Sequence, residues 1–158
     1  MNIRIAVIGL IIMALTFAAP AEDLNSSAVP ARLGGISINV SDLDRATAYY
    51  KMIGLVAEDR HGEAPKRTQY MNINATKATF NYGGLVLHED KSTTPYTAGD
   101  PNSLSIFLVA DAKAVCQRLA DAKMPCDREP RAEGPTKVIA ARAHDPDGRS
   151  VEFIQLLQ

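Results

Sequence analysis

The chain has 158 residues, and its 17 basic and 18 acidic side chains give a formal net charge of −1. This length suits a single domain of ordinary size, whose core can fold without a disulfide or a metal. The near-neutral charge, with no run of lysine or arginine, gives no indication of a nucleic-acid partner or of binding to an anionic membrane surface.

The first 21 residues predict a secretory signal peptide. A short positive start that ends at Arg4 is followed by an apolar stretch over 5–17, and Ala19-Pro20-Ala21 fits a small-x-small cleavage site. The apolar stretch is shorter than the roughly 20 residues that a membrane span needs, although an uncleaved anchor remains the alternative. We expect an exported protein, periplasmic or secreted, that is free of the membrane once the signal is removed.

A flexible leader over 22–32 is expected to precede one domain over 33–158. Residues 35–40 alternate between apolar and polar side chains, which is typical of a strand with one covered face. Ser41 or Asp42 is expected to cap a helix that ends at Gly54. The rest of the first half predicts a strand from 55, an irregular strand or a hairpin over 68–73 and 77–82, and a strand over 85–88.

A stretch rich in threonine, proline and glycine over 91–101 predicts a linker, after which the pattern repeats. The repeat contains a strand over 103–109, a helix over 111–123, and strands over 125–128, 137–143 and 151–157. Because both halves run in the same order, the sequence predicts modules at about 33–90 and 102–157. We expect an α+β fold in which paired βαβββ modules form curved mixed sheets around a cleft, with the helices on the outside.

Cysteine occurs at two positions, Cys116 in the second predicted helix and Cys126 in the strand expected after it. A helix and the strand on which it packs can bring two Cα atoms within disulfide distance, and export favours oxidation. The alternative is a pair of small buried apolar side chains, and the sequence leaves both interpretations open.

The end of the chain combines a tight turn with an alternating strand. Asp145-Pro146-Asp147-Gly148 has strong turn chemistry, because proline presets φ, aspartate side chains bond to nearby amides and glycine accepts positive φ. Two aspartates could also suggest calcium, but the turn explains both. In the strand that follows, Glu152 lies on one face and Val151 and Phe153 on the other.

These motifs resemble the vicinal oxygen chelate superfamily, which includes glyoxalase I, fosfomycin-resistance thiol transferases, extradiol dioxygenases and bleomycin-binding proteins. The stretch 37–46, with Tyr49-Tyr50 and Ile53-Gly54-Leu55, resembles its opening module, and 145–153 resembles its closing strand. The resemblance covers about 32–157. It implies paired βαβββ modules around a cleft, often in a dimer.

Enzymes of that superfamily usually hold one divalent metal on side chains from four strands. Carried over, the ligand positions fall at Gly35, at Val86, near Leu104 and at Glu152. Only Glu152 carries a donor, whereas a metal site needs three or four nitrogen or oxygen ligands. His88 shares the predicted face of Val86, but two ligands are still too few. We therefore expect no metal and no other cofactor.

The sequence favours an exported, metal-free protein that binds a small organic molecule in the cleft between the modules, as a homodimer. The competing hypothesis is a metal-dependent lyase, isomerase or thiol transferase of the glyoxalase I or fosfomycin-resistance type, with Glu152 as the catalytic residue. It rests on the resemblance alone, so whether the chain is an enzyme stays open. In a purely structural role, Glu152 would pair with His88, Asn39 or an arginine. The expected ligand-binding residues are Ser37, Asn39, Val86, His88, Leu104, Ile106 and Glu152.

Overall fold

A computed structural model describes residues 35–73, 84–95, 104–134 and 137–157, which belong to one compact unit that begins at Arg32. The predicted signal peptide, the leader and the segment 77–82 fall outside these described residues. None of the described helices is long and apolar enough to cross a membrane.

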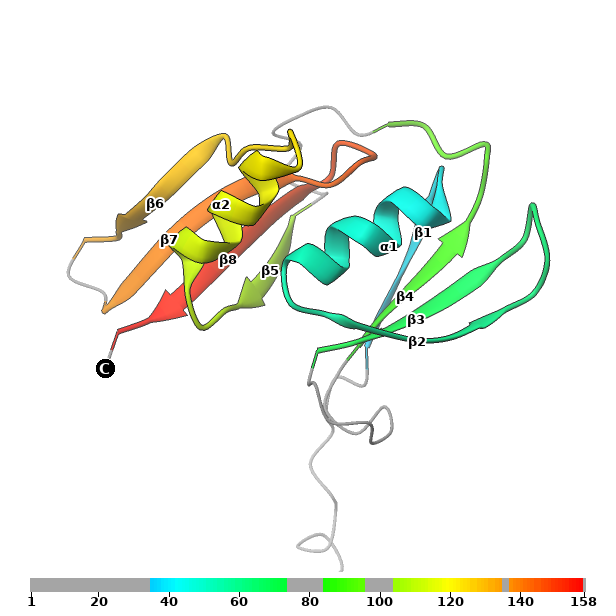
Figure 1. The fold of residues 1–158 in the computed structure, drawn as a ribbon, viewed down its shortest axis with the longest axis horizontal. Helices are drawn as coiled ribbons and strands as arrows, with labels where there is room; N and C mark the ends of the chain where they lie inside the picture. Colours follow the sequence, from blue (N-terminus) through cyan, green and yellow to red (C-terminus); the bar gives the residue numbers. More distant parts are fainter. Residues whose placement is uncertain (1–34, 74–83, 96–103, 135–136, 158) are drawn as a thin grey trace, which may run out of the picture. The chain divides into compact units, whose positions relative to one another are not determined.

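The first module contains four strands and one helix, and the helix lies across one face of the sheet (Figure 1). The sheet order is β1-β4-β3-β2, with β1 parallel to β4 and the other neighbours antiparallel. The elements are β1 (Ile36–Val40), α1 (Leu43–Met52), β2 (Val56–His61), β3 (Thr68–Asn72) and β4 (Gly84–Glu89).

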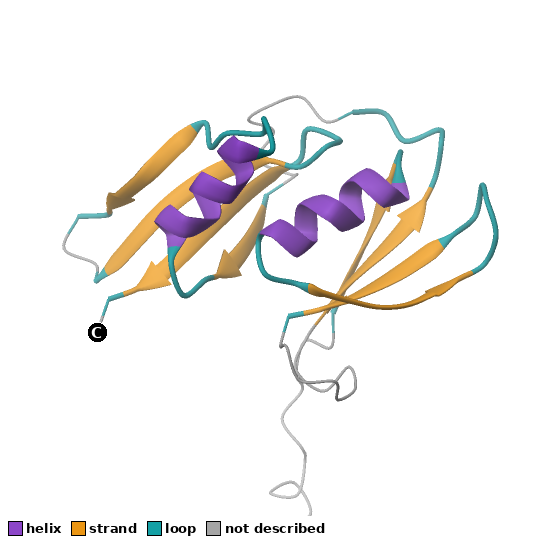
Figure 2. Ribbon diagram, in the orientation of Figure 1, coloured by secondary structure: helices purple, strands orange, loops and turns teal. Residues whose placement is uncertain are grey.

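The second module repeats this arrangement, with the sheet order β5-β8-β7-β6 and with β5 parallel to β8. Each module has one helix and four strands in the same chain order, and Figure 2 shows the helix of each module beside its strands. The predicted α+β fold with a βαβββ repeat is therefore confirmed. The elements are β5 (Ser105–Leu108), α2 (Ala112–Asp121), β6 (Arg128–Ala132), β7 (Val138–His144) and β8 (Ser150–Leu156).

Local chemistry fixes both ends of α1. Of the two predicted caps, Asp42 performs the role, because its Oδ1 accepts the backbone N–H groups of Asp44 at 3.0 Å and Arg45 at 3.1 Å. Gly54 follows the helix with φ +110°, a conformation that a side chain disfavours. The helix is thus positioned by residues that the sequence pattern identified.

Each helix buries the apolar side chains of one sheet face. In the first module, α1 contributes Leu43, Ala46 and both tyrosines, and in the second module α2 contributes Val115 and Leu119, all nearly inaccessible to solvent. Since side chains alternate along a strand, the remaining positions face away from the helix. The buried strand residues are Val40, Met71, Leu85, Leu87, Phe107, Ala141, Ala143, Val151 and Phe153.

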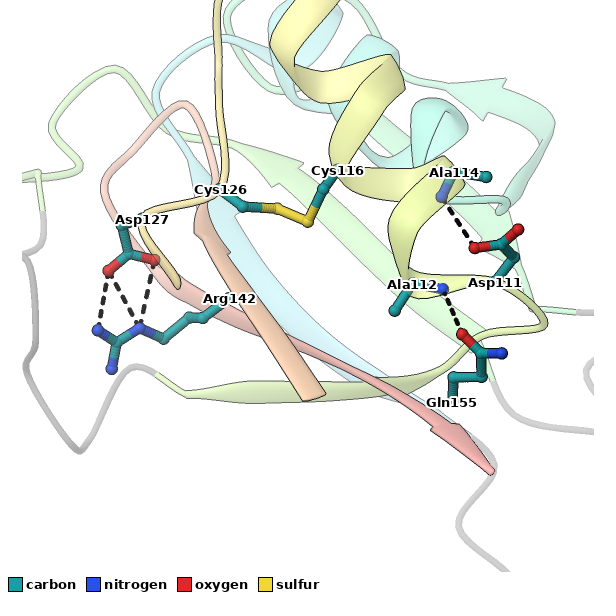
Figure 3. The surroundings of a disulfide bond; sticks show 8 residues. All are labelled: Asp111, Ala112, Ala114, Cys116, Cys126, Asp127, Arg142 and Gln155. Carbon is teal, nitrogen blue, oxygen red and sulfur yellow. Dashed lines mark hydrogen bonds and ion pairs between the residues drawn. A yellow bond between two sulfur atoms is a disulfide. The ribbon is translucent and has the colours of Figure 1, made fainter. Parts of the chain in front are cut away.

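The cysteines form a disulfide, with a Cα–Cα distance of 5.6 Å, so the alternative of two unpaired thiols is wrong (Figure 3). The strand expected over 125–128 is also wrong in its position, because β6 begins only at Arg128. The chain reverses after α2 at Lys123, whose φ is +63°, and the disulfide then ties Cys126 to the helix. The segment before Arg128 therefore connects α2 to β6 and is not part of a strand.

The predicted turn over 145–148 is confirmed, and the Asp145 side chain stabilises it. Gly148 has φ +82° and donates its N–H to the Asp145 carbonyl at 2.9 Å. Asp145 Oδ1 accepts the N–H groups of Asp147 at 3.0 Å and Arg149 at 2.9 Å. Ordinary turn bonding therefore explains the Asp145 carboxylate, whereas the Asp147 carboxylate bonds outside the turn.

The same turn joins the two modules. Asp147 Oδ2 accepts the backbone N–H of Ser41 at 3.0 Å, and the Ser41 hydroxyl donates to Asp147 Oδ1. The hydroxyl of Tyr50 in α1 donates to Asp145 Oδ2 at 3.0 Å, and Arg149 Nη1 donates to the same oxygen at 2.6 Å. Burial raises the pKa of Tyr50 well above its ordinary value, so the phenol remains a donor.

Candidate functional site

The uncovered face of the first sheet carries the four ligand-binding residues predicted in that module. Strand pairing sets Ser37 beside Val86 and Asn39 beside His88. The row through Asn39 and His88 continues to Thr68 on β3 and to His61 on β2. We call these four side chains, Asn39, His88, Thr68 and His61, the polar row.

His88 is oriented by its neighbour in the polar row. Its Nδ1 lies 3.0 Å from the Thr68 hydroxyl, which fixes the plane of the imidazole ring. Nε2 forms no hydrogen bond or ion pair with the described residues, so within this part of the chain it can bond to a ligand.

The polar row ends at a cavity of about 580 Å³ beside the carboxyl ends of β1 and β4. Asn39, Thr68 and His88 line it from the sheet, and Lys66 and Lys91 from the adjoining loops. We call this space the row cavity. It brings together two of the predicted ligand-binding residues, Asn39 and His88, with lysines that the sequence analysis did not select.

Glu89, which follows His88, is held by cations. Arg67 Nε and Nη2 lie 2.6 and 2.8 Å from its two oxygens, and Lys91 Nζ lies 3.1 Å away. The hydrogen bonds from Arg67, helped by Lys91, lower the pKa of Glu89 to about 2. Its side chain has no exposed surface, so its charge is already neutralised within the protein.

The uncovered face of the second sheet has a different chemistry. Strand pairing aligns Ile106 on β5, Glu152 on β8, Arg142 on β7 and Arg128 on β6. Ile106 is 59% exposed and Leu104, just before β5, is 46% exposed. The structure therefore brings Glu152 beside Ile106, as predicted for one face, but surrounds it with arginines.

Glu152 has an arginine partner. Arg128 Nη1 lies 3.3 Å from Glu152 Oε1, and Nη2 of the same guanidinium contacts Glu133. Arg142 pairs with Asp127 at 2.8 Å (Figure 3). The hydrogen bond to this carboxylate stabilises the charged guanidinium and so raises the pKa of Arg142. Of the pairings considered from sequence, the arginine is the one found. The sequence analysis selected neither Arg128 nor Arg142, although alternation along the strand expected over 137–143 could have placed Arg142 on the face of Glu152.

A second, apolar cavity of about 270 Å³ lies among β1, β4 and β5. Its lining includes Ile36, Leu85, Ile106, Phe107 and Leu108. Among the predicted ligand-binding residues Ile106 lines this cavity, whereas Asn39 and His88 line the row cavity. The two cavities differ in character, because charged and polar side chains line the row cavity and mostly apolar ones line this cavity.

A model of the Glyoxalase/Bleomycin resistance protein/Dioxygenase superfamily matches residues 32–153. The chain belongs to this superfamily. The match includes both modules and the closing turn, so the resemblance inferred from the motifs is confirmed. A comparison with curated proteins gives no match.

Solved structures similar to this superfamily member include glyoxalase I from Zea mays, with 19% identity, a TM-score of 0.63, and coverage of 80% of this chain and 45% of that chain. The chain therefore spans about half the length of the maize protein. An antibiotic-binding protein from a Streptomyces species is 18% identical, with a TM-score of 0.58 and coverage of 81% and 98%. The fosfomycin resistance protein from Listeria monocytogenes is 14% identical, with a TM-score of 0.58 and coverage of 79% and 93%. At these identities the likeness concerns the fold alone.

The positions at which the superfamily resemblance places metal ligands do not fit a divalent ion. A Cβ atom at Gly35 would lie 2.8 Å from the Gly84 carbonyl oxygen, so any side chain there requires the backbone to move. Val86 and Leu104 carry no donor, and Glu152 is paired with Arg128. Among the described residues, no group of three histidine, cysteine or acidic side chains is placed to hold a metal.

Proposed function

We propose that this superfamily member binds a small organic molecule, without a resident metal, in a cavity that its sheets line. One observation carries the proposal. Of the four positions where the superfamily resemblance implies metal ligands, three hold Gly35, Val86 and Leu104, which have no donor side chain. The fourth, Glu152, is already ion-paired. The two cavities supply what binding requires, because ligand sites combine apolar walls with a few polar groups. An antibiotic-binding protein shares this fold, so the fold is compatible with binding as a function.

The experiment combines a screen of organic ligands by native mass spectrometry with an assay for turnover in added zinc, nickel, iron and manganese. We expect ligand capture that is unchanged by chelator and no turnover stimulated by metal. Metal-stimulated lyase, isomerase or thiol-transfer activity that Glu152→Gln abolishes would overturn the proposal in favour of the enzyme hypothesis.

We further propose that the protein is exported and works as a homodimer. The Cys116–Cys126 disulfide supports export, because disulfides persist in oxidising compartments. Exposed apolar side chains on one module, Ile106, Leu108 and Leu156, support a second copy as a partner. Fractionation of cells that express the full chain, followed by light scattering on the purified protein, tests both. Protein confined to the cytoplasm, or a monomer at all concentrations, would contradict the respective proposal.

A further inference from the structure

We propose that the row cavity binds the carboxylate group of the organic ligand, so that the ligand is a small organic acid. This inference rests on the proposed function and adds the chemical class of the ligand. The carboxylate would contact Asn39, His88 and Lys66, while the rest of the molecule extends over the sheet toward Val86.

The charges that line the row cavity leave a single positive excess. Three cations, Lys66, Arg67 and Lys91, stand against two anions, Glu89 and Asp90, when His88 is neutral. Arg67 and Lys91 are both paired with Glu89. Arg67 also pairs with Asp44 at 3.2 Å, but Arg60 pairs with the same carboxylate at 2.7 Å, so this contact leaves the balance unchanged. One bound carboxylate therefore balances the cavity, whereas a phosphate dianion would exceed the available positive charge.

Lys66 carries the excess charge. It forms no ion pair within the described part of the chain, although it lines the cavity together with Asp90. Asp90 is engaged elsewhere, since its Oδ1 accepts the backbone N–H of Ser92 at 2.9 Å and the Ser92 hydroxyl at 2.6 Å. These hydrogen bonds lower the pKa of Asp90. Lys66 thus remains available to a ligand.

Two further side chains accompany this lysine, and the imidazole of one of them donates from Nε2 when the Thr68 hydroxyl donates to Nδ1. The Asn39 amide is exposed in the cavity wall and forms no hydrogen bond to the described residues. Strand pairing sets it directly beside His88, whose Nε2 is free of described contacts while Thr68 holds Nδ1. An amide, an imidazole and an ammonium group from three segments are a donor set that suits carboxylate oxygens.

The position of Asn39 is fixed from the other module. Arg149 Nη2 donates to the Asn39 carbonyl at 3.2 Å, and the same guanidinium is buried against Asp145. The backbone that presents the amide is therefore held before a ligand arrives. Preorganised donors bind more tightly because little entropy is lost on binding.

The test uses benzoate, its neutral analogue benzamide, and phenyl phosphate, each titrated into the full mature protein and followed by NMR amide shifts. We expect saturable binding of benzoate with shifts at Asn39 and His88, about tenfold tighter than benzamide, because a hydrogen bond to a charged group is worth about 1.4 kcal/mol or more. Phenyl phosphate is expected to bind more weakly than benzoate.

Variants distinguish specific binding in the row cavity from nonspecific attraction to surface charge. We expect His88→Ala to weaken benzoate binding about tenfold and Lys66→Gln to weaken it about two- to fivefold. Lys113→Gln removes the same charge from an exposed position on α2 and should leave the affinity unchanged. Equal losses in Lys66→Gln and Lys113→Gln, or equal affinities for benzoate and benzamide, would overturn the inference.

These outcomes differ from a failure of the proposed function. If neutral organic molecules bind the metal-free protein but benzoate gains no advantage, the function stands and the carboxylate assignment is wrong. Tightly held stoichiometric metal in the protein would contradict the function itself, whatever the benzoate titration shows.

Discussion

Asp147, in the turn of the second module, accepts two hydrogen bonds from Ser41, at the end of β1 in the first module. The two residues are 106 positions apart in the chain, and the backbone bond measures 3.0 Å. The Asp147 side chain is almost completely buried, so the loss of its partner would leave a polar group without water. This contact makes the closing turn a structural link between the modules.

Replacement of this aspartate tests the link. We expect Asp147→Ala to lower the free energy of unfolding by about 1.5–3 kcal/mol, the worth of hydrogen bonds to a charged group. Urea denaturation measures the change. Asp121→Ala, which removes an exposed carboxylate from the end of α2, should change stability by less than about 0.5 kcal/mol. Similar effects for both variants would show that Asp147 is dispensable.

Two adjacent tyrosines provide a matched pair for the second prediction. Both are fully buried, but only Tyr50 has a partner, Asp145, whereas the Tyr49 hydroxyl has none among the described residues. We expect Tyr50→Phe to cost about 1.5–3 kcal/mol of unfolding free energy, because a buried carboxylate loses one of its donors. Tyr49→Phe should be neutral or stabilising, since it removes an unsatisfied group. The reverse order, measured by thermal or urea unfolding, would refute the assignment.

The disulfide is expected to stabilise the second module. It closes a loop with a sequence separation of 10 between Cys116 and Cys126, and such a loop limits the entropy of the unfolded chain. We expect the double variant Cys116→Ser, Cys126→Ser to lose about 2–3 kcal/mol of unfolding free energy. Reductant should destabilise the natural protein and leave the double variant unaffected. Equal stability with and without reductant in the natural protein would contradict this.

Stability should decrease in acid because of Glu89. Arg67 lowers the pKa of this carboxyl from an ordinary value of 4.5 to about 2, so the folded state binds its proton less readily than the unfolded state. The stabilisation is complete above about pH 4.5 and is lost as the pH falls toward about 2. Glu89→Gln should make the melting temperature depend less on pH over this interval. Glu129→Gln, at an exposed position, should leave the pH dependence of the melting temperature unchanged. An unchanged slope in Glu89→Gln would count against this account.

Short-range chemistry made much of the fold predictable. The Asp42 cap, the glycine after α1 and the turn at Asp145 act within a few residues, so the sequence contains their complete explanation. The start of β6 was mispredicted because it depends on a disulfide that the sequence left undecided.

The site was less predictable for a related reason. The face of Glu152 follows from strand alternation, but its pairing with Arg128 depends on β6 lying two strands away in the same sheet. Ser41 and Asp147 were each placed correctly in a cap region and a turn, while their contact required the packing of two modules. Contacts across long stretches of chain depend on packing that no local pattern specifies.

The central claim is that binding in this protein proceeds without a resident metal, and elemental analysis of the purified mature protein tests it most directly. Expression in medium supplemented with zinc, nickel, iron and manganese, followed by gel filtration, gives every ion an opportunity to bind. We predict metal well below one equivalent per chain and the same ligand affinity before and after chelation. One equivalent of any of these ions, retained through gel filtration and lost in Glu152→Gln, would contradict the account.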